Sequence, residues 1–127
     1  MDYWSKEQRT VLREKLQKRA LALRGEIEDA LRRADTDEAM HLANHIEEID
    51  DQAVADLETS LDIAALERDV QELRAVEAAL RHFDSADYGR CADCREAIPY
   101  ARLMAEPTAT RCVRCQAAVE QPRARTL

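Results

Sequence analysis

Aromatic residues and glycine are scarce in this chain of 127 residues. Phe, Trp and Tyr together make up 4% of it, and there are two glycines and three prolines. Ala, Leu, Glu, Asp and Arg dominate instead, a composition typical of long helices and not of sheets. Charged residues make up 35% of the chain, so much of the helical surface faces water and a large globular core is not expected.

Long apolar runs are absent as well. The first residues, MDYWSKEQRTVL, contain nothing like the apolar segment of a secretory signal. No window approaches the roughly 20 apolar residues that cross a membrane. We therefore expect a soluble, cytoplasmic protein with no membrane partner.

Positive charge is depleted in the middle of the chain. Residues 26–87 hold 19 acidic and 5 basic residues, whereas the rest holds 7 acidic and 14 basic residues, which gives the net charge of −7. The acidic middle is a poor surface for DNA. The basic ends could contact phosphates or an acidic protein, although solvated helix faces explain most of these charges equally well.

All four cysteines lie between residues 88 and 115. Cys91 and Cys94 form one Cys-x-x-Cys pair, Cys112 and Cys115 form another, and 17 residues separate the pairs. This spacing is typical of a four-thiolate zinc site. Four filled tetrahedral positions leave none for water, so we expect one structural Zn²⁺. Disulfides are disfavoured in a cytoplasmic protein, and redox sensing by the same thiolates is the minor alternative.

Apolar residues at helical spacing predict a first long helix. Ser5 is a candidate N-cap, and Gln8 is its capping-box partner three residues later. The stripe that follows consists of Leu12, Leu16, Leu23, Ile27 and Leu31. Gly25 interrupts the stripe without necessarily ending the helix.

A second stripe predicts a second long helix over residues 54–83, with near-heptad steps in its later part. Two such helices joined by a turn are expected to form an antiparallel hairpin. Residues 34–38 and 48–52 are both weak points that could hold the turn, and the pattern alone favours neither. Asp50 or Asp51 is a candidate cap for the second helix.

These patterns predict a mainly α fold, in which a long antiparallel helical hairpin, or coiled coil, joins a small four-cysteine zinc finger with a short C-terminal helix. The hairpin is expected to occupy residues 1–87 and the finger residues 88–120, and residues 121–127 are expected to form a frayed tail. Within the finger, the expected apolar core consists of Ile98, Leu103 and Met104.

The finger segment resembles the DksA/TraR family of bacterial transcription regulators. The residues that carry the resemblance follow the family's order: Tyr88, Gly89, Cys91, Cys94, Ile98, Arg102, Leu103, Ala105, Pro107, Ala109, Cys112 and Cys115. The resemblance implies a non-enzymatic regulator whose coiled coil enters the secondary channel of RNA polymerase. There it is expected to change open-complex stability and so promoter output.

The resemblance also implies acidic residues at the tip of the coiled coil, near the polymerase active centre. Glu48, Asp51 and Ala53 match the family's tip pattern, and Asp50 lies beside them. The resemblance therefore favours a turn at residues 48–53. It gives Asp51 the central role, although a helix cap is an ordinary alternative for that aspartate. Arg68, on the second helix, is expected to contact the channel rim.

The finger departs from the family pattern at several positions. Arg95 follows Cys94 where the family usually has glycine, at a position that often needs positive φ. Glu106 and Gln116 stand where members that respond to ppGpp carry basic residues. Neither side chain attracts a pyrophosphate, so we expect no dependence on ppGpp at this site.

Other functions remain open from the sequence. A zinc-ribbon nucleic-acid binder could use five arginines, Arg90, Arg95, Arg102, Arg111 and Arg114, but the acidic arm and the lack of interleaved aromatics disfavour it. No sequence-specific DNA binding is expected. A coiled-coil adaptor that dimerises is an alternative to the monomer we expect. No catalytic pattern predicts an enzyme. His41 and His45, four apart, could share a metal, although such pairs are more often simply exposed.

Overall fold

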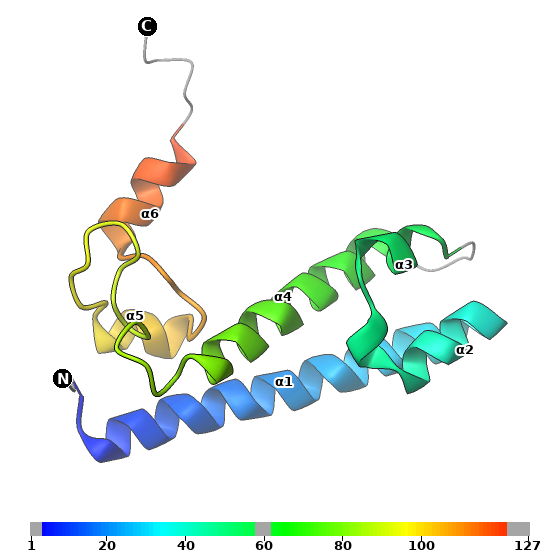
Figure 1. The fold of residues 1–127 in the computed structure, drawn as a ribbon, viewed down its shortest axis with the longest axis horizontal. Coiled ribbons are helices and arrows are strands. Elements are labelled where there is room, and N and C mark those ends of the chain that lie inside the picture. The colour runs from blue at the N-terminus through cyan, green and yellow to red at the C-terminus, as the bar shows by residue number, and fades with distance from the viewer. Residues whose placement is uncertain (1–3, 58–61, 122–127) are drawn as a thin grey trace, which may run out of the picture. The chain divides into compact units, whose positions relative to one another are not determined.

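Helices make up almost all the regular structure of this computed structural model, which describes residues 4–57 and 62–121. They are α1 (Lys6–Ala34), α2 (Asp37–Asn44), the short 3-10 helix η1 (Ile46–Glu48), α3 (Asp51–Ala55), α4 (Ile63–Arg81), α5 (Tyr100–Ala105) and α6 (Val113–Glu120). Figure 1 traces them in chain order. The predicted mainly α fold is therefore confirmed. The tail expected over residues 121–127 lies, apart from its first residue, outside the described residues.

The chain divides into two compact units. One consists of residues 17–78, and the other combines the first 16 residues with everything from residue 79 onward. The second unit therefore contains the finger together with the first turns of α1 and the last residues of α4. The boundary that we expected at residue 87 stays a prediction.

The start of α1 is fixed by the predicted capping box. The backbone N–H of Ser5 donates to Gln8 Oε1 at 2.9 Å, and the backbone N–H of Gln8 donates to Ser5 Oγ at 3.1 Å. These two bonds satisfy donors that a helix N-terminus otherwise leaves without partners. The predicted stripe is buried along its whole length, and Gly25 lies within the helix without ending it.

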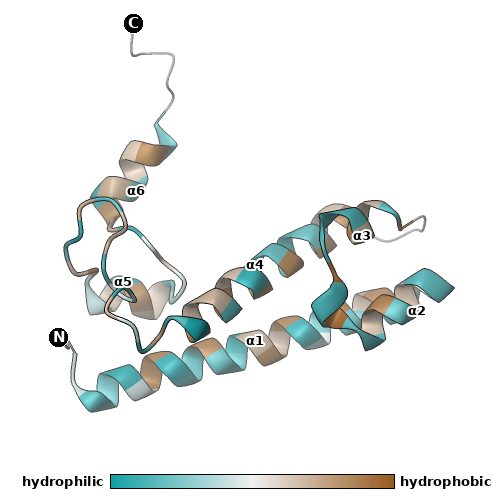
Figure 2. Ribbon diagram, viewed as in Figure 1, coloured by the Kyte–Doolittle hydropathy of each residue, from teal (hydrophilic) through white to brown (hydrophobic). Residues whose placement is uncertain are grey.

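In the unit of residues 17–78, α1 and α4 run antiparallel as the two arms of the hairpin (Figure 1). Apolar positions recur between polar ones along both helices (Figure 2). The buried seam residues are Leu23, Ile27 and Leu31 of α1 and Leu66, Val70, Leu73 and Val76 of α4. Arg19 adds an ion pair to Glu72 across the two helices, and Arg24 adds one to Glu77.

The first weak point, residues 34–38, interrupts the chain. α1 ends at Ala34, and Asp35 takes a left-handed φ of 53°, a conformation that Asp tolerates better than most residues. Thr36 then caps α2 by accepting a hydrogen bond from the backbone N–H of Ala39 at 3.1 Å. Arg32 Nη2 donates to Asn44 Oδ1 at 2.9 Å. A continuous helix would separate residues 32 and 44 by about 18 Å, so α2 folds back along α1.

The second weak point, residues 48–52, interrupts the chain too, because it separates η1 from α3. A further break follows it, and the single helix predicted over residues 54–83 is therefore wrong. α3 ends at Ala55, and α4 begins only at Ile63. Val54 and Leu57 are buried, so they belong to the core of this unit and do not extend the stripe of α4. Asp62 Oδ1 accepts the backbone N–H of Ala65 at 3.0 Å, which begins α4 afresh.

Candidate functional site

The first cysteine pair lies in a tight turn that follows Gly89. The backbone N–H of Cys91 donates to the carbonyl of Glu96 at 2.8 Å, and the N–H of Arg95 donates back to the carbonyl of Cys91 at 3.0 Å. Arg95 has a φ of 66°, so the expectation of positive φ after Cys94 is confirmed. This is the left-handed region that favours glycine, and the turn tolerates an arginine there.

The second pair lies at the start of α6. Cys112 is the N-cap, and its Sγ accepts the backbone N–H of Cys115 at 3.4 Å. The two turns are joined because the backbone N–H of Ala92 donates to the carbonyl of Thr110 at 2.8 Å. Helix capping and one loop-to-loop hydrogen bond therefore bring together cysteines that are far apart in sequence.

The four sulfur atoms have the spacing of a tetrahedral metal site. All four cysteines are free thiols, and their Sγ atoms lie within 4.8 Å of one another. Cys94 Sγ and Cys112 Sγ are 4.0 Å apart. Zinc–sulfur bonds of about 2.3 Å place tetrahedral ligands about 3.8 Å apart. The donor set therefore fits one Zn²⁺ with four protein ligands.

The surroundings of Cys91 and Cys112 favour their thiolate forms. The backbone N–H groups of Cys94 and then Cys112 lower the pKa of the Cys91 thiol to about 6. The backbone N–H of Cys115 lowers the pKa of Cys112. Neighbouring thiols, that of Cys112 foremost, raise the pKa of Cys115 to about 12. Negative sulfurs this close repel one another, and a divalent cation removes that repulsion.

The expected apolar core beside the metal site is mostly present. Ile98 and Leu103 are 1% and 0% exposed, whereas Met104 is only half-buried. The hydroxyl of Tyr88 donates to the carbonyl of Pro107 at 3.0 Å, and burial raises the pKa of Tyr88 to about 12. These contacts stabilise the finger in addition to the metal site.

The finger and the helical arm both have known counterparts. Residues 86–121 match the prokaryotic dksA/traR C4-type zinc finger family. The structure of transcription factor DksA2 from Pseudomonas aeruginosa is similar with a TM-score of 0.66 and 29% identity, over 93% of this chain and 87% of that one. The chain is a DksA-like protein. Its cofactor is the zinc ion of a C4 finger, with Cys91, Cys94, Cys112 and Cys115 positioned to hold it.

Curated relatives of the chain are named DksA. The RNA polymerase-binding transcription factor DksA of Haemophilus influenzae is 36% identical over 70 residues, which are 55% of this chain and 48% of that protein. Its namesake in Salmonella typhimurium is 31% identical over 99 residues, 78% of this chain and 65% of that protein. The DksA-like chain therefore spans about half to two thirds of the length of these relatives. None of the helices in its described part has the length and apolar content needed to cross a membrane.

The tip residues that the sequence predicted lie close together in one short segment, residues 46–53. Glu48 ends η1, and its carboxylate accepts a hydrogen bond from His41 Nε2 at 3.2 Å. Asp50 is the N-cap of α3, and its Oδ1 accepts the backbone N–H of Ala53 at 2.7 Å. Sequence patterns had left open whether Asp50 or Asp51 is the cap, and the structure assigns that role to Asp50.

The side chain of Asp51 is more exposed than that of Glu48, the other residue of this segment that forms an ion pair. Its carboxylate accepts hydrogen bonds from Gln71 at 3.1 Å and from Arg74 Nη1 at 3.2 Å, yet 83% of the side chain is exposed. Arg74 Nη2 also donates to the carbonyl of Ile49 at 3.0 Å. Gln71 lies eight residues, or about 12 Å, into α4, so this segment is held against the side of that helix. Sequence analysis did not identify Arg74, because nothing local links it to residue 51.

The structure also describes the other positions that the sequence analysis singled out, Arg68, Glu106 and Gln116. Arg68 is exposed on α4 and forms no ion pair with any described residue. Glu106 pairs with Arg102 at 3.6 Å, and Gln116 donates to Glu120 at 2.7 Å. Glu106 therefore lies beside Arg102, and Gln116 lies beside the carboxylate of Glu120.

Most arginines of the finger are already bonded within it. Arg95 pairs with Asp87 at 3.1 Å, and Arg111 pairs with Asp93 at 2.9 Å. Arg90 donates to the carbonyl of Arg95 at 2.8 Å. Contact with nucleic-acid phosphates would have to break these bonds, which weighs against a nucleic-acid interface here.

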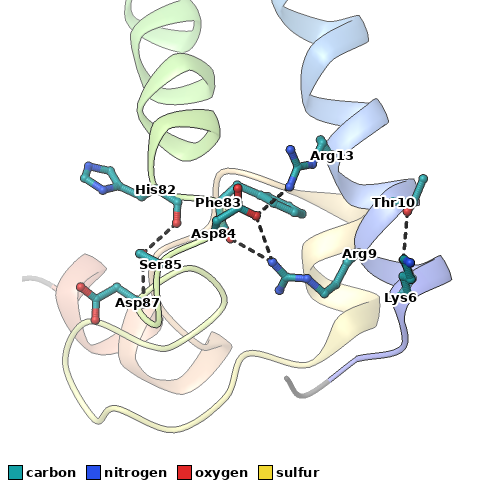
Figure 3. A network of polar contacts seen from close by, with 9 residues as sticks. All are labelled: Lys6, Arg9, Thr10, Arg13, His82, Phe83, Asp84, Ser85 and Asp87. Atoms are coloured by element: carbon teal, nitrogen blue, oxygen red, sulfur yellow. Dashed lines mark hydrogen bonds and ion pairs between the residues drawn. The ribbon is translucent and has the colours of Figure 1, made fainter. Parts of the chain in front are cut away.

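Sequence analysis missed an aromatic and cationic cluster at the base of the finger (Figure 3). The guanidinium carbons of Arg9 and Arg13 lie 5.0 and 4.8 Å from the ring centroid of Phe83. Both arginines also pair with Asp84, at 3.4 and 2.7 Å. The ring of Tyr88 lies 4.8 Å from that of Phe83. These contacts join the first turns of α1 to the start of the finger.

Proposed function

We propose that this DksA-like protein binds bacterial RNA polymerase in its secondary channel and regulates transcription without catalysing a reaction. The observation that carries the proposal is that the likeness to DksA proteins is not confined to the zinc finger. Similarity to the DksA2 structure extends over 93% of the chain, and the helical hairpin is therefore shared as well. The relatives are named as RNA polymerase-binding transcription factors.

The proposed mechanism is electrostatic. Glu48, Asp50 and Asp51 bring acidic groups to one segment, and Asp51 presents a carboxylate that is largely open to solvent. At the polymerase active centre, this carboxylate meets metal ions and basic groups, which would replace Arg74 as its partners. The effect is a change in open-complex stability and so in promoter output. Arg68 is available for a contact at the channel rim.

The proposal is tested by multi-round transcription from a ribosomal RNA promoter with purified polymerase. Asp51→Asn removes one charge and is expected to abolish the effect of the protein. An exposed ion pair contributes only about 0.2–1 kcal/mol, so the variant stays folded. Asp56→Asn is the matched control, because Asp56 is an exposed aspartate at the end of α3 whose carboxylate accepts a hydrogen bond from Gln52.

The control is expected to act like the wild type. Full activity of Asp51→Asn would contradict the proposed role of the acidic segment, and equal loss in both variants would show that no specific carboxylate is involved. A wild type that neither binds polymerase nor changes output would contradict the proposal as a whole.

The finger site is proposed to work without ppGpp. Glu106 and Gln116 offer the nucleotide no positive charge, and Glu106 would repel a pyrophosphate. Transcription with and without the nucleotide is expected to give the same response to this protein. Strong synergy would overturn this part of the proposal.

A monomer suffices for this function. The apolar seam is filled within one chain, since Leu23, Ile27 and Leu31 are fully buried there. Sedimentation is expected to give the mass of one chain, 14.5 kDa. A stable dimer would favour the coiled-coil adaptor instead.

A further inference from the structure

We propose that His41, His45 and Glu48 form a second metal site, which takes a divalent first-row transition ion such as Zn²⁺. One ligand atom from each of the three side chains lies within 4.8 Å of the others. His41 and Glu48 are exposed and His45 is half-buried, so an ion can reach them from solvent. The finger cysteines take no part in this cluster.

The backbone positions the three side chains for a common ligand. His41 lies in the last turn of α2, and His45 is the residue that ends this helix. Their rings are stacked, with centroids 4.5 Å apart and an interplanar angle of 24°. The chain then turns through η1 and returns Glu48 to the same place. Histidines four residues apart with a nearby carboxylate are a recurrent zinc-binding arrangement.

The observed separation of donor atoms suits a metal ion. His41 Nε2 and Glu48 Oε1 are 3.2 Å apart. Zinc bonds of about 2.0–2.2 Å to nitrogen and oxygen place tetrahedral ligands about 3.3–3.5 Å apart. An ion that replaces the shared proton between these two atoms therefore requires only a small shift.

A hydrogen bond to the backbone already fixes the position of the proton on His45. Its Nδ1 lies 2.9 Å from the carbonyl oxygen of His41. A carbonyl only accepts, so Nδ1 carries the proton and Nε2 of the neutral ring keeps its lone pair. Metal-binding histidines are commonly held in this way, with the other ring nitrogen donating to a backbone carbonyl or a carboxylate.

The donor set also indicates the class of ion. Two imidazoles and one carboxylate favour zinc and its first-row neighbours, whereas Mg²⁺ and Ca²⁺ prefer oxygen ligands. Three protein ligands leave a tetrahedral position for water or for a group from a partner. This site is therefore open and exchangeable, unlike the four-cysteine site.

Metal binding here would act on the acidic segment. The ion would join η1 to α2 immediately before Asp50 and Asp51, and it would offset the charge of Glu48. A bound ion thus restrains the chain that carries the proposed polymerase contact. The binding itself does not depend on that function.

The test uses full-length, tag-free protein whose four cysteines already hold one equivalent of zinc. Added Zn²⁺ is followed by calorimetry, and the histidine ring resonances are followed by NMR. We expect a second equivalent to bind and to shift the rings of His41 and His45. His45→Gln is expected to lower the affinity for this second ion at least about 100-fold, since even the loss of a residue that only orients a ligand costs ~10–100-fold.

His82→Gln is the matched control, because His82 is exposed and lies outside the cluster. It is expected to bind the second equivalent like the wild type. Retention of the first equivalent shows that the finger of each variant stays folded, and an unchanged far-ultraviolet helical signal shows the same for the hairpin. The proposal is overturned if the wild type binds a single equivalent, or if His45→Gln binds the second ion as tightly as the control.

Discussion

Replacing Phe83 tests whether one aromatic side chain holds the base of the zinc finger to the start of α1. Phe83 is 1% exposed. Two guanidinium groups lie within about 5 Å of its ring centroid, and the Tyr88 ring lies at 4.8 Å. Leucine keeps most of the apolar contact at this position but provides no ring for these three partners.

The expected loss of stability follows from the interactions that the Phe83 ring makes. Each cation–π contact contributes about 0.5–1 kcal/mol, and the aromatic pair contributes about 0.5–1.5 kcal/mol. Phe83→Leu is therefore expected to lower the free energy of unfolding by about 1.5–3.5 kcal/mol. Phe83→Ala adds a cavity and is expected to lower it by about 3–5 kcal/mol. Packing and ring contacts thus outweigh the ion pairs beside them.

Asp84→Asn provides the comparison. It removes the ion pairs to Arg9 and Arg13, but the Asp84 side chain is 75% exposed, so the expected loss is at most about 1 kcal/mol. Urea unfolding of the zinc-saturated variants, followed by circular dichroism, measures all three changes. The reasoning fails if Phe83→Leu destabilises the protein no more than Asp84→Asn does.

Four further predictions concern charge, backbone and metal. Arg19 hydrogen bonds lower the pKa of Glu72, so this pair stabilises the protein at neutral pH and the contribution is lost as pH falls through that lowered pKa. Both side chains are over 40% exposed, so Glu72→Gln should lower the free energy of unfolding by at most about 1 kcal/mol at pH 7. Unfolding measured at acidic pH should show no difference between this variant and the wild type. Gly25→Ala should raise the free energy of unfolding by about 0.5–1 kcal/mol because open space surrounds this helical position. Gly89→Ala should lower it by more than about 1 kcal/mol, because φ is +82° and a methyl group would collide with Trp4; a neutral effect would contradict the described packing. Chelation of zinc should unfold the finger while leaving most of the far-ultraviolet helical signal, and complete loss of that signal would show that the hairpin depends on the metal.

Features encoded by short-range spacing were predictable from sequence. The zinc ligands follow from two identical cysteine pairs, and the capping box follows from Ser5 and Gln8. Both depend on residues at most a few positions apart, or on a ligand set with few chemical alternatives. The buried seam was predictable for a related reason, since helical periodicity marks the face that must leave water.

The course of the chain between α1 and α4 was not predictable in this way. The sequence offers residues 34–38 and 48–52 as alternative turns, whereas the structure interrupts the helices at both and again between Ala55 and Ile63. The contacts that stabilise this arrangement join Arg32 to Asn44 and Arg74 to Ile49. Such pairs depend on tertiary packing, which overrides local propensity and leaves no periodic signal.

The aromatic cluster illustrates the same limit. The chain contains few aromatic residues, yet Trp4, Phe83 and Tyr88 converge on one place. Each of these residues is easy to notice in a sequence with few aromatics. Trp4 and Phe83 are nevertheless 79 residues apart, and no spacing rule predicts that they lie close together. Only the return of α4 beside the start of α1 brings them together.

Asp50 and Asp51 are neighbours in the acidic segment, residues 46–53, and the sequence does not distinguish their roles. The structure does. Either one could cap a helix, and either one could serve a partner. Asp50 uses its carboxylate on the backbone N–H of Ala53, and a cap of this kind contributes about 1 kcal/mol. Asp51 is therefore not needed for capping, and its side chain stays 83% exposed beside Arg74. An exposed pair contributes little to stability, so the carboxylate of Asp51 can exchange its intramolecular partner for an external cation at small cost, whereas Asp50 cannot do so without loosening α3.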